Sequence, residues 1–248
     1  MEHKEYVRIN DGSKIAFLFI HGIIGTPNHF NKFVSLVPKS LSVYNLLLDG
    51  HGKGVKDFSK TSMKKWEMQV ASVVEELSLT HEKIYIVAHS LGTLLAIDQA
   101  VQTQKVCKLF LLAVPLRLSL KPKMVSNILK VYFDKIRPDD YEALAAKECY
   151  GIGKDKNLLH YIGWIPRYFE LFAKIRKTRK VLNSLNTACL VFQSRNDEMV
   201  SRKSKKYFEN KSNIILSELE KSGHYYYGKE DFDYLITEFK KMLALDSN

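Results

Sequence analysis

The apolar residues of the 248-residue chain gather into short runs that alternate with amphipathic segments. Short apolar runs rich in β-branched residues predict buried strands, whereas apolar residues three and four positions apart predict helices. The predicted strands are residues 15–20, 42–48, 83–88, 106–114, 188–193 and 213–216. The predicted helices are residues 28–37, 62–79, 91–104, 164–185, 202–208 and 231–243. This alternation predicts an α/β fold with a mostly parallel central sheet and helices on both faces.

A segment rich in Lys, Tyr and Leu interrupts the alternation between residues 116 and 163. Its pattern indicates helices and loops where the chain should otherwise return to the sheet. We therefore expect a small helical cap, residues 116–163, inserted into a core formed by residues 1–115 and 164–248. Apolar stripes at helical spacing usually reflect packing, but an apolar cap also suits a bound acyl chain.

Composition and charge exclude several classes of protein. Hydrophobic residues make up 46% and charged residues 26% of the chain, which is typical of a globular domain. The formal net charge of +11 can favour nucleic acid or anionic membranes. However, the basic residues are spread widely, with local clusters at 174–180 and 202–206, and form no nucleic-acid-binding module. We expect a solvated basic surface and no nucleic-acid partner, with a basic surface-binding protein as an alternative.

The targeting and cysteine patterns favour a reducing compartment. Residues 1–11 are polar and lack the apolar centre of a signal peptide, and no apolar run is long enough to span a bilayer. The three cysteines lie far apart without a CxxC pair, which argues against a disulfide framework or a zinc site. We expect a cytoplasmic protein without stable membrane insertion, metal or cofactor. The oligomeric state stays open.

The strongest chemical signal is a serine between a predicted strand and a predicted helix. The strand 83–88 runs directly into Ala88-His89-Ser90-Leu91-Gly92. Such a turn is tight, so the residues two before and two after the serine must be small, and Ala88 and Gly92 are. The turn presents Ser90 at a helix N-terminus, where negative charge is favoured. Ser90 is therefore a candidate nucleophile. The alternative is a serine that only caps a helix.

A glycine-containing loop, His21-Gly22-Ile23-Ile24-Gly25, follows another predicted strand. Acyl transfer requires N–H donors directed at the developing oxyanion, and glycine lets the backbone approach a substrate closely. The N–H groups of Ile23 and Leu91 are our candidates for an oxyanion hole. An ordinary Gly/Pro turn is the alternative interpretation.

Two later loops carry a candidate acid and a candidate base. Asp197 follows the predicted strand 188–193, where a carboxylate can orient a histidine, and Glu198 is the adjacent alternative. His224 follows Gly223 between the last predicted strand and the last predicted helix. Neutral imidazole there can take a serine proton and return it to a leaving group. A turn aspartate that caps a helix is the alternative for the acid.

The other seven histidines carry weaker signals. His21 and His51 lie in glycine-containing loops, which indicates structural roles. His89 precedes Ser90, and we expect it to point away from the pocket. The remainder, including His29, are interpreted as surface or packing residues.

The order Ser, acid, His is typical of α/β-hydrolases, and the sequence resembles this superfamily over nearly its whole length. More narrowly, it resembles small bacterial carboxylesterases and monoacylglycerol lipases. The residues that carry the resemblance are His21-Gly22 with Gly25-Thr26, Leu48 to Gly52, Ala88 to Gly92, Asn196 to Val200 and Ser222 to His224. The chain departs from the pattern at Ala88, where Gly is usual, and at Thr93, where a second Gly is frequent. It also lacks the common Pro before the strand that begins at Ala188.

The resemblance implies a Ser90, Asp197, His224 triad, an oxyanion hole at Ile23 and Leu91, and a cap over an acyl pocket. We therefore expect a serine hydrolase that cleaves carboxylic esters of short- to medium-chain acyl groups, including monoacylglycerols, through an acyl-enzyme. A thioesterase or acyltransferase with the same triad is an alternative. A peptidase, a carbon–carbon hydrolase and a non-catalytic binder of hydrophobic ligands are others. Substrate-binding residues remain unassigned.

Overall fold

The computed structural model describes residues 3–244 and contains a seven-stranded sheet in the order β1-β3-β2-β4-β5-β6-β7. The strand β1 is antiparallel to β3, and every other neighbouring pair is parallel. The strands are β1 (Tyr6–Arg8), β2 (Ile15–Ile20), β3 (Ser42–Leu46), β4 (Lys83–His89), β5 (Val106–Leu112), β6 (Ala188–Ser194) and β7 (Ile214–Leu219). The α/β fold expected from the alternation is confirmed.

The helices also follow the expected order along the chain. They are η1 (Pro27–Phe30), α1 (Asn31–Val34), α2 (Val55–Lys60), α3 (Met63–Thr80), α4 (Leu91–Gln102), α5 (Pro122–Tyr132), α6 (Tyr141–Cys149), η2 (Leu158–Trp164), α7 (Ile165–Val181), η3 (Leu182–Ser184), η4 (Arg202–Tyr207) and α8 (Lys229–Ala244). Two short elements, β1 and α2, were not predicted. The three residues of β1 are mostly exposed, and α2 has six residues, so neither carries a periodic apolar pattern.

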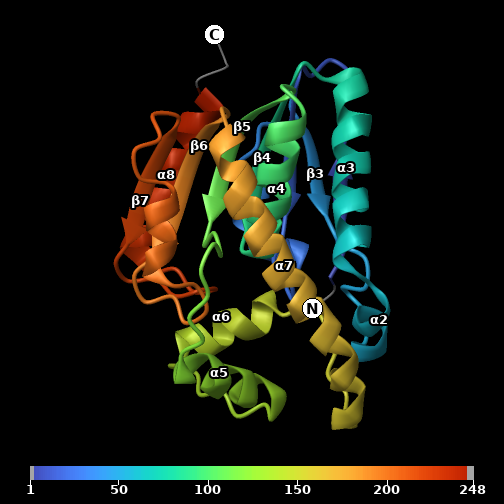
Figure 1. Ribbon diagram of the computed structural model, residues 1–248, viewed down its shortest axis with the longest axis vertical. Coiled ribbons are helices and arrows are strands. Elements are labelled where there is room, and N and C mark those ends of the chain that lie inside the picture. Colours follow the sequence, from blue (N-terminus) through green and yellow to red (C-terminus); the bar gives the residue numbers. More distant parts are fainter. Residues whose placement is uncertain (1–2, 245–248) are drawn as a thin grey trace.

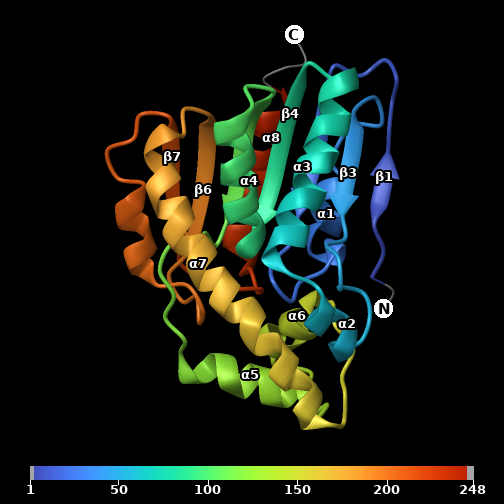
Figure 2. The same ribbon diagram turned by 45° about the vertical axis from the view of Figure 1, so that its right-hand side comes forward.

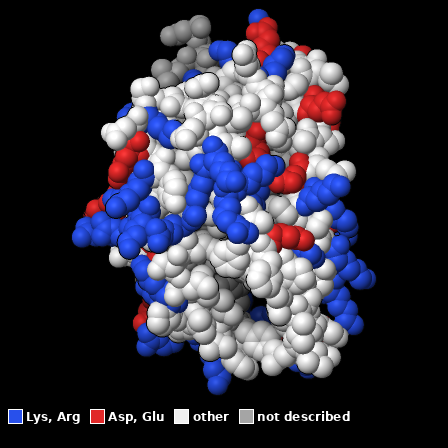
Figure 3. All heavy atoms as spheres, in the orientation of Figure 1, with Lys and Arg blue, Asp and Glu red and all other residues white. Residues whose placement is uncertain are grey.

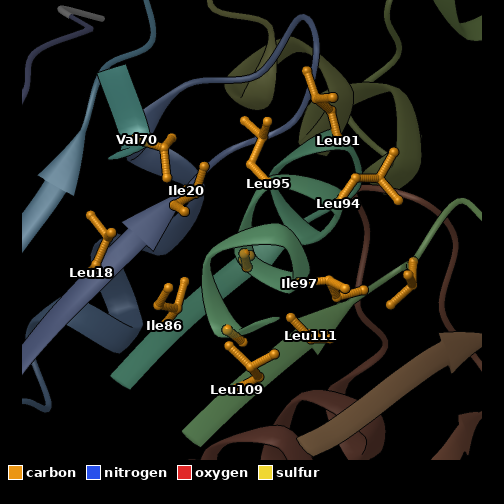
Figure 4. Packing of buried hydrophobic residues seen from close by; sticks show 14 of the residues in the cluster. Leu18, Ile20, Val70, Ile86, Leu91, Leu94, Leu95, Ile97, Leu109 and Leu111 are labelled. Atoms are coloured by element: carbon orange, nitrogen blue, oxygen red, sulfur yellow. The ribbon is translucent and has the colours of Figure 1, made fainter. Parts of the chain in front are cut away.

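The sheet separates two apolar cores because successive strand side chains point to opposite faces. In β2, Leu18 and Ile20 join the core beneath α3, α4 and α7, whereas Phe17 and Phe19 join the core beneath η1, α1 and α8. Figures 1 and 2 show these helices on the two faces of the sheet. In Figure 4 the side chains of α4 pack against those of β2, β4 and β5. Burial on both faces explains why these strands read as continuous apolar runs.

Helices α5, α6 and η2 form a layer beyond the carboxyl ends of the parallel strands, at the bottom of Figure 1. Backbone hydrogen bonds tie this layer to two loops of the sheet edge. The N–H of Lys121 donates to the Glu198 carbonyl at 2.9 Å, and the N–H of Gly151 donates to the Ile24 carbonyl at 2.9 Å. The division into a cap, 116–163, and a core, 1–115 with 164–248, stays a prediction, and residues 1, 2 and 245–248 lie outside the described part. No described helix has the length and apolar character needed to cross a membrane.

Candidate active site

Ser90 occupies a sharp turn between β4 and α4. Its backbone has φ of 51°, in the left-handed region that non-glycine residues seldom adopt, which costs about 1–3 kcal/mol. The surrounding structure holds the turn: the Ser90 N–H donates to the Leu112 carbonyl at 2.9 Å, and the Thr93 hydroxyl donates to the Ser90 carbonyl at 2.6 Å. Ser90 itself is 7% exposed. Strain of this kind is frequent at functional sites and supports a role for the serine beyond helix capping.

Two glycines allow the chain to pack closely around Ser90. A Cβ at Gly92 would lie 2.1 Å from the Ile20 carbonyl oxygen, so no other residue fits there without backbone movement. A Cβ at Gly22 would lie 3.1 Å from the Ser90 Cβ and 3.6 Å from its Oγ. The loop after β2 therefore borders Ser90 directly, as the glycine pattern predicts.

Buried histidines hold this loop in place. The His51 Nε2 donates to the Ile23 carbonyl at 2.6 Å, and the His21 Nε2 accepts from the Leu48 N–H at 3.1 Å. Burial lowers the pKa of His51 and lowers that of His21 well below its ordinary value, so both stay neutral near pH 7. Leu91 is the first residue of α4, and its N–H has no intrahelical acceptor. The loop that carries Ile23 and the N-terminus that carries Leu91 thus flank Ser90.

Asp197 and His224 form a buried hydrogen-bonded pair. The Asp197 Oδ2 lies 2.9 Å from the His224 Nδ1, and each side chain is 1% exposed. The other carboxylate oxygen, Oδ1, accepts from the N–H groups of Met199 at 2.8 Å and Val200 at 2.7 Å. An acidic partner at Nδ1 fixes the imidazole tautomer with its proton on Nδ1, which leaves Nε2 as a proton acceptor.

The protonated form of His224 is favoured by its neighbours. Burial opposes a charge on the imidazole, but the charge of Asp197, its hydrogen bond and the charge of Glu198 outweigh burial and raise the pKa of His224. A raised pKa strengthens the imidazole as a base. This is the property that a proton acceptor in acyl transfer requires.

His224 and Ser90 are not joined by a hydrogen bond. The His224 Nε2 is buried and has no hydrogen-bond partner within residues 3–244. Their segments meet instead through His89, whose Nε2 donates to the His224 carbonyl at 2.9 Å and whose ring centroid lies 4.7 Å from that of His224. The two candidates therefore lie at the same edge of the sheet, connected through the residue that precedes Ser90.

The structure shows a contact of His89 that the sequence did not reveal. We expected this side chain to point away from the pocket, and that expectation stays a prediction. Its ring packs against His224 and lies 4.3 Å, centroid to centroid, from the ring of His29. Along β4 the alternation places His89 on the same face as Tyr85 and Val87. That face carries η1 and the loop of His224, which explains the contact.

Glu198, the alternative acid, does not contact an imidazole nitrogen in the way that Asp197 does. Its Oε2 accepts from the backbone N–H of His224 at 2.9 Å. Of the two adjacent carboxylates, one therefore orients the ring and the other holds the backbone of the same residue.

An apolar cavity of about 520 Å³ opens between the layer of α5, α6 and η2 and the loop after β2. Most of its lining is aliphatic or aromatic and comes from α5, η2 and the start of α7: Ile24, Ile128, Val131, Tyr132, Lys147, Tyr150, Ile152, Gly153, Lys154, Tyr161, Trp164, Ile165 and Tyr168. Ile24 joins the cavity to the loop that borders Ser90. In Figure 3 the lower part of the visible face is mostly uncharged, whereas Lys and Arg gather across its middle.

The cavity includes residues that the sequence did not single out. Ile128 and Val131 belong to the predicted cap, whose apolar stripes were interpreted mainly as packing, and they line the cavity together with Trp164. Ile24 and Tyr150 were not predicted, because each lies in a loop whose position depends on the hydrogen bond between Gly151 and Ile24. Within the described chain, no group of three or more His, Cys, Asp and Glu side chains is placed to hold a metal ion.

Comparison with solved structures identifies close matches in fold. One is a metagenome-derived enzyme from a study of the lipolytic enzymes LipS and LipT, with 16% identity, a TM-score of 0.72 and coverage of 96% of this chain and 98% of that chain. The monoacylglycerol lipase of Paleococcus ferrophilus has 16% identity, a TM-score of 0.70 and coverage of 98% and 99%. A meta-cleavage product hydrolase from Pseudomonas fluorescens has 17% identity, a TM-score of 0.62 and coverage of 96% and 93%. No family model and no curated protein matches the sequence.

Proposed function

Because the chain has the α/β-hydrolase fold, we propose that it is a serine hydrolase that cleaves carboxylic esters, with Ser90 as nucleophile, His224 as base and Asp197 as the acid that orients it. The observation that supports this most is the buried Asp197–His224 pair at the same sheet edge as the strained Ser90 turn. A nucleophile at a sharp strand-to-helix turn, followed in the chain by an acid and a histidine, is the arrangement that this chemistry uses.

The proposed reaction has two steps. His224 Nε2 takes the proton of the Ser90 hydroxyl while Oγ attacks the ester carbonyl, and the N–H groups of Ile23 and Leu91 stabilise the oxyanion. The imidazolium then gives its proton to the leaving alcohol, and the acyl group stays on Ser90. Water, activated by the same imidazole, attacks the acyl-enzyme and releases the acid. No described residue forms a hydrogen bond with Nε2, so the proposed reaction requires its bond to the Ser90 hydroxyl to form when the substrate binds.

The cavity suggests the class of substrate. A volume of about 520 Å³ with a mainly apolar lining suits an aliphatic acyl chain, and Ile24 places one end of the cavity beside the loop that carries Ile23. We therefore propose acyl groups of short to medium length, with monoacylglycerols among the substrates. Structural relatives described as a lipolytic enzyme and a monoacylglycerol lipase support this choice.

Filling the cavity is expected to shorten the preferred acyl chain. Ile128 on α5 lines the cavity and is partly exposed, so a larger side chain fits there without disrupting a core. Each methylene that leaves water is worth about 0.8 kcal/mol, so the loss of room for two methylenes should lower kcat/KM for the longest good substrate by about tenfold in Ile128→Trp. Activity on acetyl esters should change little. A chain-length series of nitrophenyl esters measures both.

The matched control is Leu129→Trp, one position along α5, where the side chain is exposed and outside the cavity lining. This variant should keep the chain-length profile of the wild type. If both variants shifted the preferred acyl chain length equally, the cavity would not be the acyl-binding site. No hydrolysis of any ester by the wild type would remove the proposed function itself.

Two related activities use the same residues. A thioesterase or an acyltransferase differs only in the bond broken or in the acceptor, so a panel of matched esters and thioesters with added alcohols separates them from an esterase. A carbon–carbon hydrolase is a further candidate because one structural relative is described as a meta-cleavage product hydrolase. A small-molecule substrate, a cytoplasmic location and the absence of a nucleic-acid partner remain predictions.

A further inference from the structure

Glu198 is a buried carboxylate that lacks a cationic partner. It is 5% exposed, and none of the ion pairs formed by residues 3–244 includes it. A buried charge without a counter-charge is unfavourable unless hydrogen bonds or a transient positive charge compensate it. The reaction proposed above would create such a positive charge on His224.

The position of Glu198 is tightly defined. Its Oε2 accepts from the His224 N–H at 2.9 Å, while its backbone carbonyl accepts from the N–H of Lys121 in the cap at 2.9 Å. A Cβ at residue 223 would lie 2.9 Å from Oε2, so glycine at this position lets the carboxylate reach the loop. The Glu198 side chain therefore holds the segment that carries His224 in place.

The other groups that face His224 are neutral near pH 7, apart from Asp197. Burial, aided by His224, lowers the pKa of His29 on η1 to about 3, and burial lowers that of His89 well below its ordinary value. Burial also raises the pKa of Tyr225 well above its ordinary value. On the cap side, burial raises the pKa of Tyr150, which faces Glu198. Asp197 and Glu198 are thus the two negative charges available to a His224 cation.

We propose that Glu198 is a positioning residue for His224: it fixes the histidine loop through the backbone N–H and stabilises the imidazolium that forms when His224 takes the Ser90 proton. The proton moves from Oγ to Nε2 and then to the leaving alcohol, and none is transferred to Glu198. This inference rests on the proposed function, since it assigns a second carboxylate to the same site. The two neighbouring carboxylates then act on His224 in different ways. Asp197 orients the ring, whereas Glu198 holds the backbone and stabilises the positive charge.

Removal of the charge alone tests the proposal. In Glu198→Gln the side-chain carbonyl can still accept from the His224 N–H, but the negative charge is lost. Neutral His224 is the active base, so kcat/KM rises with pH through the pKa of His224. The charge of Glu198 raises that pKa. Glu198→Gln should therefore move the acid limb of the pH profile of kcat/KM to lower pH, and it should reduce the plateau value of kcat/KM by about fivefold. A residue that only packs the loop would leave the limb in place.

Two further variants complete the test. Glu220→Gln removes an exposed carboxylate four residues before His224 and should leave both the limb and the plateau unchanged. Glu198→Ala removes the bond to the His224 N–H as well and should lose at least about tenfold in kcat/KM. An active Glu198→Gln enzyme whose acid limb coincides with that of the wild type would overturn the inference. By contrast, a wild type inactive on every ester would overturn the proposed function.

Discussion

Replacement of Ser90 by alanine is expected to reduce ester hydrolysis at least about a thousandfold while the protein stays folded. The hydroxyl is the group that forms the acyl-enzyme, and the oxyanion donors alone cannot replace a nucleophile. Alanine is no larger than serine and tolerates the left-handed backbone at this position no worse, so the turn should persist. The measurement is kcat/KM on a nitrophenyl ester, with a thermal melt followed by circular dichroism as the test of folding.

A matched variant, Ser35→Ala, removes an exposed hydroxyl after α1 and should keep full activity. Turnover of Ser90→Ala within tenfold of the wild type, from a folded sample, would be incompatible with a serine mechanism at this position.

The second large effect is expected on the free energy of unfolding, through a buried lysine on α7. Lys174 on α7 is buried, with 1% of its side chain exposed, between the carboxylates of two other helices. Its Nζ donates to the Glu67 Oε1 of α3 at 2.5 Å and to the carboxylate of Asp98 on α4. This cluster joins α7 to α3 and to α4, the helix that follows Ser90.

Lys174→Met should lower the free energy of unfolding by about 3 kcal/mol, because the buried Asp98 carboxylate loses its main counter-charge. Lys177, whose Nζ lies 3.5 Å from Asp98, can replace only part of it. Denaturation in urea measures the difference. The exposed Lys180→Met on the same helix should stay within about 0.5 kcal/mol of the wild type.

A double variant separates lost charge from lost packing. Adding Asp98→Leu to Lys174→Met should recover most of the stability, since a buried pair replaced by apolar residues is often neutral. If the single variant unfolds at the same urea concentration as the wild type, the cluster does not stabilise the fold.

The fold was largely predictable because the sheet is buried on both faces. The central strands appear as apolar runs, and residues 15–20 were predicted with the observed bounds. The basic segment 174–180, in contrast, was interpreted as a solvated surface, and Lys174 is buried. Sequence spacing shows a helical face but not which charges on it meet partners from α3 and α4.

The candidate site was predictable in its parts but not in all its contacts. The turn at Ser90 can be identified from the sequence because close packing there requires small residues or glycine, such as Gly92. The hydrogen bond between Glu198 and the His224 backbone cannot be predicted in this way. The two residues are 26 positions apart, and the donor is a backbone N–H, which every non-proline residue has. The contact of His89 with His224 likewise depends on how the end of β4 meets a loop far away in the sequence.

In the proposed function, His224 and Asp197 make the Ser90 hydroxyl a nucleophile. Its most direct test is the reaction of the intact protein with a fluorophosphonate, which labels serines of this kind covalently, followed by intact mass and peptide sequencing by mass spectrometry. We expect one adduct per chain, located on Ser90 and lost when His224 is replaced by alanine. An unmodified protein, or an adduct on another residue with Ser90 unmodified, would contradict it.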